Sequence, residues 1–108
     1  MIDAQFEQSA SGFVAFRVSG HAGYADAGED VVCAAVSSAV MLTANGITQC
    51  AGIPAQVGEE GNVISCRLPG EEEQGMLFLQ ALYLHLTCLE EQYPGFLRVR
   101  VKPVGGGQ

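Results

Sequence analysis

The chain has 108 residues, a length suited to one domain with its own hydrophobic core. Hydrophobic residues make up 48% of it and charged residues 16%, a balance that excludes an intrinsically disordered chain. The formal net charge of −7 argues against binding to a nucleic-acid backbone and favours a basic partner or substrate.

The N-terminal segment predicts a β-hairpin. The sequence IDAQFEQ at residues 2–8 is a strand candidate, and the polar residues SASG separate it from FVAFRVSGHA at residues 13–22. In the second segment Phe13, Ala15 and Arg17 alternate with Val14, Phe16 and Val18, which is the pattern of a strand. Residues 1–15 lack the basic start and continuous apolar run of a signal peptide, so we expect a cytoplasmic protein.

An apolar helix is predicted after a glycine-rich, acidic loop that runs from about His21 to Glu29. Asp30 is a plausible N-cap, so the helix is expected from about Val31 to Thr48. Small and apolar residues surround nearly the whole helix, which is typical of a helix in a core or an interface. Serine, threonine, asparagine and glycine interrupt the apolar segment 31–47, which we expect to be too short to cross a bilayer.

The second half of the chain predicts a strand, a tight turn and a strand within residues 55–68, with the turn at GEEGN. Pro69-Gly70 breaks the chain, and Glu71, Glu72 and Glu73 supply the negative charge that favours a helix start. This helix is expected to run to about Gln92, with leucines along one side. Residues 96–103, FLRVRVKP, alternate as a last strand.

These elements follow the order ββ-α-β(β)-α-β, without a regular alternation of strands and helices. The order predicts an α+β fold: a single mixed, mostly antiparallel sheet of four or five strands with two helices. Residues 1–104 are expected to form one domain, and the glycine-rich residues 105–108 a disordered tail.

His21 and Cys33 are the candidate catalytic pair. Cys33 is expected in the first turn of the helix, where unpaired amides and the helix dipole stabilise a thiolate and an oxyanion. His21 ends the preceding strand, and the loop is long enough to fold back and bring the imidazole near the thiol. A histidine in that position takes the thiol proton and later returns a proton to a leaving amine.

Two residues are candidates for supporting roles: Asp30 either orients the imidazole or only caps the helix, and Ser37 either donates a hydrogen bond to the thiolate or only packs. The loop residues expected to contact substrate or to permit a closing lid are Gly20, Gly23, Tyr24 and Gly28. On spacing alone, the alternative is that neither residue is catalytic: Cys33 would be a small buried side chain and His21 a surface residue.

The other cysteines are weaker candidates. No C-x-x-C pair is present, which argues against a structural zinc site, and Cys50 and Cys66 are expected to be core thiols. His85 and Cys88 lie one helical turn apart, but no second ligand pair accompanies them, so packing is favoured over metal binding. We predict neither a metal nor a cofactor.

The stretch GHAGYADAGEDVVCAAVSS at residues 20–38 closely resembles the motif of the bacterial ribosomal-processing cysteine protease family, Prp. Members of that family carry a G-H-A-x-Y block, a short acidic loop and a D-[IV]-V-C-A-[AG]-[VI]-S block that opens a helix. Chain length, the glutamate-rich start of the second helix and the final strand also fit, so the resemblance extends over nearly the whole chain.

The resemblance implies a small α+β homodimer that acts as a cysteine endopeptidase, with the family's histidine at His21 and its nucleophile at Cys33. The implied reaction removes a short N-terminal extension from large-subunit ribosomal protein twenty-seven during bacterial ribosome assembly. The loop between the two residues is expected to close over the substrate peptide.

Two further hypotheses are kept. A non-enzymatic assembly factor would bind a basic ribosomal protein through its acidic surface, without turnover. A thiol-based redox or metal sensor ranks last, because no resolving thiol or second ligand lies near Cys33 in the sequence. None of the three hypotheses includes a nucleic acid or a membrane as a direct partner.

Overall fold

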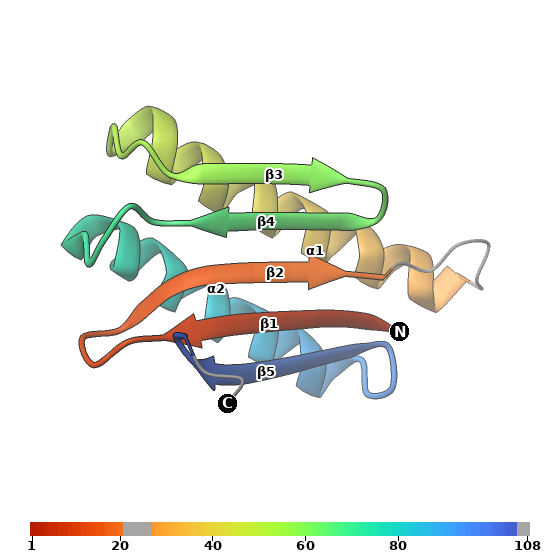
Figure 1. Ribbon diagram of the computed structural model, residues 1–108. Helices are drawn as coiled ribbons and strands as arrows, with labels where there is room; N and C mark the ends of the chain where they lie inside the picture. The colour runs from red at the N-terminus through yellow and green to blue at the C-terminus, as the bar shows by residue number, and fades with distance from the viewer. Residues whose placement is uncertain (21–26, 106–108) are drawn as a thin grey trace.

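The computed structural model describes the backbone of residues 1–20 and 27–105, and the side chains of residues 1–20 and 31–105. Within this part of the chain, five strands form one sheet in the order β3-β4-β2-β1-β5 (Figure 1). The strands are β1 (Ile2–Gln8), β2 (Phe13–Ser19), β3 (Gln56–Glu60), β4 (Val63–Arg67) and β5 (Leu97–Pro103). The predicted α+β class and element order are confirmed.

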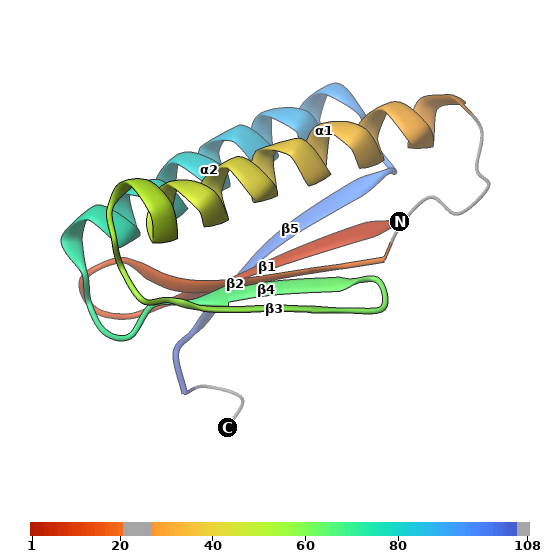
Figure 2. The same ribbon diagram turned by 90° about the horizontal axis from the view of Figure 1, so that it is seen from above.

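Neighbouring strands pair antiparallel except β1 and β5, which are parallel. The helices are α1 (Ala27–Asn45), which continues into the π-helical turn η1 (Gly46–Cys50), and α2 (Glu73–Gln92). Both helices lie on the same face of the sheet, which leaves the other face open (Figure 2). The molecule therefore has two layers, and its core lies between them.

Strand alternation and helical periodicity supply this core. On β1, Ala4 and Phe6 point to the helix-covered face, and the register places Phe6 beside Phe16 on β2 and Val101 on β5. Each helix contributes to the core a row of aliphatic side chains that are at most 8% exposed. These are Val32, Val36 and Val40 on α1 and Leu79, Leu82, Leu86 and Leu89 on α2.

α1 begins earlier than its sequence predicts. The helix starts at Ala27, not near Val31, so Asp30 lies inside the helix and is not its N-cap. Cys33 consequently lies in the second turn, where its amide is no longer among the four unpaired N–H groups of the helix start. The physical reason is that acidic residues are as favourable inside the first turn as at the cap, so they mark a helix start only approximately.

The segment Val31–Cys50 is long and apolar enough, by length and composition, to cross a membrane. The sequence predicts an apolar segment that ends at residue 47 and is too short to cross a bilayer; the helical segment reaches Cys50, so this prediction is wrong by length and composition. One side of this segment nevertheless packs into the core through Val32, Val36, Val40 and Ile47. A helix of the core of a globular domain has the same composition, so the segment by itself is weak evidence of a membrane span.

The end of α1 approaches α2 closely at a glycine. Gly46 is buried, and a Cβ atom built on it would lie 2.5 Å from Cε1 of Phe78. The Phe78 ring therefore occupies the space that any other side chain at position 46 would need. This contact holds the C-terminal end of α1 against the start of α2.

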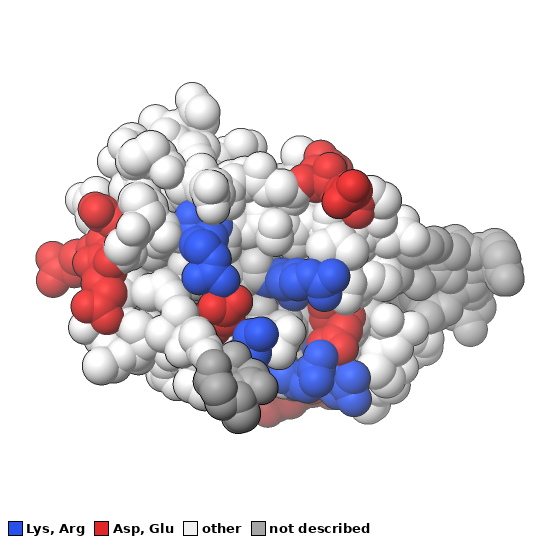
Figure 3. All heavy atoms as spheres, viewed as in Figure 1, with Lys and Arg blue, Asp and Glu red and all other residues white. Residues whose placement is uncertain are grey.

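Charge is segregated between the two faces of the sheet. All Lys and Arg side chains belong to strand positions that alternate with the core positions, so they lie on the open face: Arg17, Arg67, Arg98, Arg100 and Lys102. Figure 3 shows these basic groups gathered over the middle of the open face, with acidic groups near its ends. Asp3 and Glu7 lie among them and form ion pairs with Arg98, Arg100 and Arg67.

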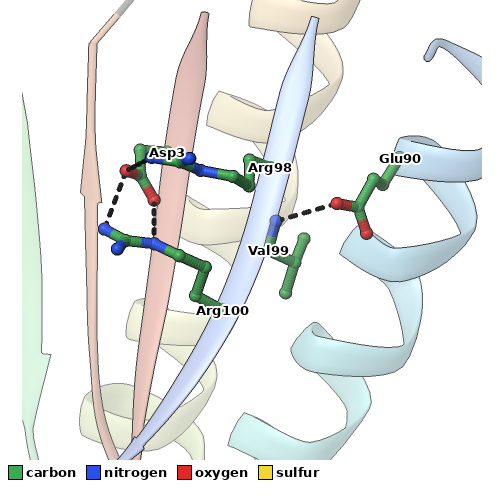
Figure 4. A network of polar contacts seen from close by, with 5 residues as sticks. All are labelled: Asp3, Glu90, Arg98, Val99 and Arg100. Atoms are coloured by element: carbon green, nitrogen blue, oxygen red, sulfur yellow. Dashed lines mark hydrogen bonds and ion pairs between the residues drawn. The ribbon is translucent and has the colours of Figure 1, made fainter. Parts of the chain in front are cut away.

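Two polar contacts secure the parallel strand β5 (Figure 4). The Asp3 carboxylate on β1 accepts hydrogen bonds from Arg98 at 3.1 Å and from Arg100 at 2.8 Å. On the other side of β5, the Val99 N–H donates to the Glu90 carboxylate of α2 at 3.1 Å. The second contact satisfies a backbone donor that an edge strand leaves unpaired.

Asp3→Asn is expected to lower the free energy of unfolding at neutral pH by about 1 kcal/mol, because it removes the shared carboxylate between two arginines. Burial raises the pKa of Asp3, but hydrogen bonds and charges from Arg98 and Arg100 outweigh this and hold the pKa below its ordinary value of 3.8. The unfolded chain therefore binds the proton more readily, and the stabilisation is present above pH 3.8 and lost as the pH falls through the folded-state pKa.

The measurement is urea unfolding of the wild type and the variant from pH 7 down to the acid limit of the fold. The difference in the free energy of unfolding between wild type and Asp3→Asn should become smaller at the lowest pH values. Glu91→Gln, at an exposed position of α2, is the control and should change stability by less than about 0.5 kcal/mol. A difference for Asp3→Asn that stays constant with pH would contradict the ion-pair account.

Candidate functional site

A cleft of about 220 Å³ lies between α1 and the β3–β4 hairpin. Its α1 side is lined by Cys33, Val36, Ser37, Val40 and Met41. Its opposite side comes from the hairpin, including Glu59, Asn62 and Ile64, and its end from Ile2, Val18 and Gly20. In Figures 1 and 2 the turn of the hairpin and the start of α1 lie at the same end of the molecule.

Helical periodicity brings Cys33 and Ser37 to this cleft together. Each follows a buried valine by one position, and the two are one helical turn apart, so they form a row beside the buried row. Met41 continues this row. The Cys33 side chain is half-buried and packs partly against the core, with the rest of its surface in the cleft.

The floor of the cleft is apolar. Val18, Val36, Val40 and Ile64 all line it, and the first three are nearly fully buried. A thiol in this position is open to a ligand on one side and supported by packed aliphatic side chains on the other. The geometry suits a small polar reaction centre at the edge of an apolar groove.

The other three thiols lie in different surroundings. Cys66 is 1% exposed on β4, and this burial raises the pKa of its thiol, as expected for a core cysteine. Cys88 is exposed on α2. Cys50 is also exposed, so the prediction that it is a core thiol is wrong: the turn of η1 buries Gly46 and Ile47 and leaves Cys50 outside.

The structure places part of the predicted site. Cys33, Ser37 and Gly20 line one cleft, although Gly20 and Ser37 come from different elements. His21, Gly23 and Tyr24 lie outside the described residues, as does the side chain of Asp30. Gly28 belongs to the first turn of α1 and not to a loop, and its contact with substrate stays a prediction. The extra helical turn at the start of α1 is the reason that Gly28 is helical.

No metal centre is found among the residues that the structure describes: none of their His, Cys, Asp and Glu side chains gather in groups of three or more. His85 and Cys88 are both exposed on α2. The cleft itself carries one thiol and one carboxylate from the described residues, which is too few to hold a metal ion.

The hairpin wall is the part of the site that the sequence analysis missed. The sequence predicts a turn at GEEGN, but its first three residues belong to β3. Pairing of β3 with β4, and of β4 with β2, brings Glu59 to the cleft beside α1. The alternation of Glu59 with Gly58 and Glu60 was the available signal. Which of the two glutamates faces a helix depends on strand pairing, which the segment does not encode locally.

Comparisons with known proteins agree with one another. The family model described as cysteine protease Prp matches residues 1–98 of this chain. The ribosomal processing cysteine protease Prp of Bacillus subtilis (strain 168) is 29% identical over 107 residues, which cover 92% of this chain and 96% of the relative.

Solved structures share the fold. SMU.848 from Streptococcus mutans is 28% identical, with a TM-score of 0.81 over 95% of both chains. The essential ribosomal processing protease Prp from S. aureus, solved with a covalently linked product peptide, has a TM-score of 0.85. It is 23% identical and matches over 94% of this chain and 100% of its own. At that identity the likeness concerns the fold.

Gly20→Ala is expected to destabilise the end of β2 where it enters the cleft. Gly20 has φ +83°, and a Cβ atom there would lie 2.6 Å from the carbonyl oxygen of Met1. We expect a loss of about 2–3 kcal/mol in the free energy of unfolding, from backbone strain plus the clash. Gly52→Ala is the matched control, because Gly52 has φ +67° but no atom within 4 Å of the added Cβ.

The control separates backbone strain from the steric clash with the Met1 carbonyl oxygen. Gly52→Ala should lower the free energy of unfolding by about 1 kcal/mol, because only the left-handed backbone is strained there. Urea unfolding of both variants measures the difference. Equal losses would contradict a close approach between Gly20 and the N-terminal residue.

Proposed function

The chain belongs to the cysteine protease Prp family, and from this premise we propose that it is an endopeptidase that removes the N-terminal extension of large-subunit ribosomal protein twenty-seven. The observation that carries the proposal is the position of Cys33, half-exposed in a cleft between a helix and a hairpin. Such a cleft admits an extended peptide, and its apolar floor excludes water from one side of the thiol.

Cys33 is the nucleophile in this proposal, and His21 is its base. Gly20, the chain neighbour of His21, lines the cleft, which supports the pairing. His21 takes the thiol proton as Sγ of Cys33 attacks the scissile carbonyl carbon. Collapse of the tetrahedral intermediate breaks the C–N bond, and His21 gives the proton to the leaving amine.

The second half of the reaction restores the enzyme. The product of the first half is a thioester between Cys33 and the carbonyl of the cleaved extension. Water, deprotonated by His21, attacks this carbonyl, and the C–S bond breaks as His21 returns that proton to Sγ. The carboxylic acid so formed gives its remaining proton to the solvent and leaves as the carboxylate. Each proton removed from a nucleophile is thus returned to a leaving group.

Ser37 is proposed to stabilise the thiolate. It lies one helical turn from Cys33 and faces the same cleft, so its hydroxyl is placed to donate a hydrogen bond in that direction. Asp30 is kept as a candidate that orients His21. Because α1 starts at Ala27, the unpaired amides of the helix start belong to residues 27–30 and not to Cys33.

We also propose that the protein is a cytoplasmic homodimer that associates through α1. Two large α1 side chains beyond the cleft row are apolar and exposed: Val31 is 52% exposed and Leu42 72%. No charged residue occurs between Val31 and Cys50. An exposed helix face of this composition is typical of a subunit interface.

The proposed activity is tested with a peptide that spans the extension and the first mature residues of the ribosomal protein from the same genome. The wild type should make a single cut, read by mass spectrometry. Cys33→Ala should abolish turnover while leaving unfolding by urea within about 1 kcal/mol of the wild type, because the side chain is only half-buried. His21→Ala should lower kcat by at least about a hundredfold.

Cys88→Ala serves as the matched control, because Cys88 is exposed on α2, outside the cleft. Its kcat should equal that of the wild type. Binding of the peptide by wild type and Cys33→Ala alike, with no cut by either, would favour the non-enzymatic assembly factor.

Leu42→Glu is expected to convert the dimer to a monomer, because it introduces a charge in the apolar face of α1 at a position that is 72% exposed in the subunit. Sedimentation velocity on both proteins measures the change. Leu84→Glu, on α2 and 56% exposed, is the control and should leave the dimer intact. A monomeric wild type, or dissociation of both variants alike, would contradict an interface on α1.

A further inference from the structure

The two glutamates of the β3–β4 hairpin point to opposite faces of the sheet. Glu59 pairs with Ile64, which pairs with Val18, and this row belongs to the face that α1 covers. Glu60 pairs with Val63 and through it with Ser19, one residue further along, so it belongs to the open face. Glu59 lines the cleft, and Glu60 does not.

Among the described residues that line the cleft, Glu59 is the one with a carboxyl group. None of the Lys and Arg side chains of the chain lines the cleft, because every one of them lies on the open face of the sheet. The facing side chains of α1 are Cys33, Ser37 and Met41, and the floor is aliphatic. A carboxylate beside an apolar wall attracts a cation more strongly than one surrounded by water.

We propose that Glu59 selects the substrate: it binds a lysine or arginine side chain of the peptide, close to the bond that Cys33 cleaves. The inference rests on the proposed peptidase function and adds to it the chemistry of one substrate position. An extended peptide advances about 3.3–3.6 Å per residue, so it crosses a cleft of this size in about two or three residues. The basic residue therefore lies within about three residues of the cut.

Glu59 is a specificity-determining residue in this proposal, whereas Cys33 and His21 carry out the chemical steps. Its effect should appear in KM and in the choice of peptide, with kcat nearly unchanged. An ion pair at an exposed position is worth about fivefold in affinity. The effect should also shrink at high ionic strength, because salt screens exposed charges.

The experiment uses the ribosomal protein peptide and a set of its variants. In each variant one of the three positions on either side of the cut carries either Lys or Gln. Wild type, Glu59→Gln and Glu60→Gln are compared by kcat/KM on every peptide. Glu60→Gln is the matched control, since it removes the same charge from the same hairpin on the opposite face.

The wild type should prefer Lys to Gln at one position by about fivefold, and Glu59→Gln should lose this preference through a higher KM for the Lys peptide. Glu60→Gln should keep it. Glu59→Lys, assayed with an additional peptide that carries Glu at that position, should prefer Glu to Lys there. Equal selectivity of Glu59→Gln and wild type, or an equal loss in both Gln variants, would overturn the proposal.

A failure of the proposed function is distinguishable from a failure of this inference. If the wild type cuts none of the peptides, the peptidase assignment is wrong. The Cys33→Ala protein and the Cys33→Ala/Glu59→Gln double variant are then titrated with a Lys-rich and a Gln-substituted peptide. A charge preference that the double variant lacks would still support Glu59 as the cation-binding group, and equal binding of both peptides would overturn it.

Discussion

The burial of one side of α1 against the sheet is the constraint on which the rest of the molecule depends. Val32, Val36 and Val40 recur every four residues and are at most 3% exposed, so they fix the rotation of the helix about its own axis. The next row, Cys33, Ser37 and Met41, is thereby turned toward the β3–β4 hairpin and lines the cleft. Leu42 is left on the outside, where a second subunit is proposed to bind.

Strand alternation determines which side chains lie on each face of the sheet. Core side chains occupy one set of strand positions and all the basic side chains occupy the other, so the sheet separates an apolar face from a cationic one. The net charge of −7 conceals this separation. None of these basic side chains lines the cleft, where Glu59 is proposed to bind a basic residue of the peptide.

The parallel pairing of β1 and β5 supports the cleft from its far side. β5 is held to β1 by Asp3 and to α2 by Glu90, so the last strand of the chain secures the first. The start of β1 in turn contacts the end of β2: Ile2 and Gly20 both line the cleft, and the Met1 carbonyl lies against Gly20. The chain therefore leaves β2 toward His21 from a position that three strands define.

Local patterns in the sequence determined the elements and the class of the fold. Alternation marked the strands, apolar composition marked α1, and the turn residues separated β3 from β4, because these signals depend on neighbours in the chain. The dense motif around His21 and Cys33 determined the family, which the match over residues 1–98 then established. The start of α1 was placed late, since acidic residues suit both the cap and the first turn.

Only the tertiary structure decided which segments meet. The parallel register of β1 and β5 joins residues at opposite ends of the chain, and the approach of the β3–β4 hairpin to α1 builds the cleft. The exposure of Cys50, the contact of Gly46 with Phe78 and the direction of Glu59 follow from those pairings. The physical reason is that burial and strand register are set by the packing of distant segments, whereas propensity and periodicity act only over a few residues.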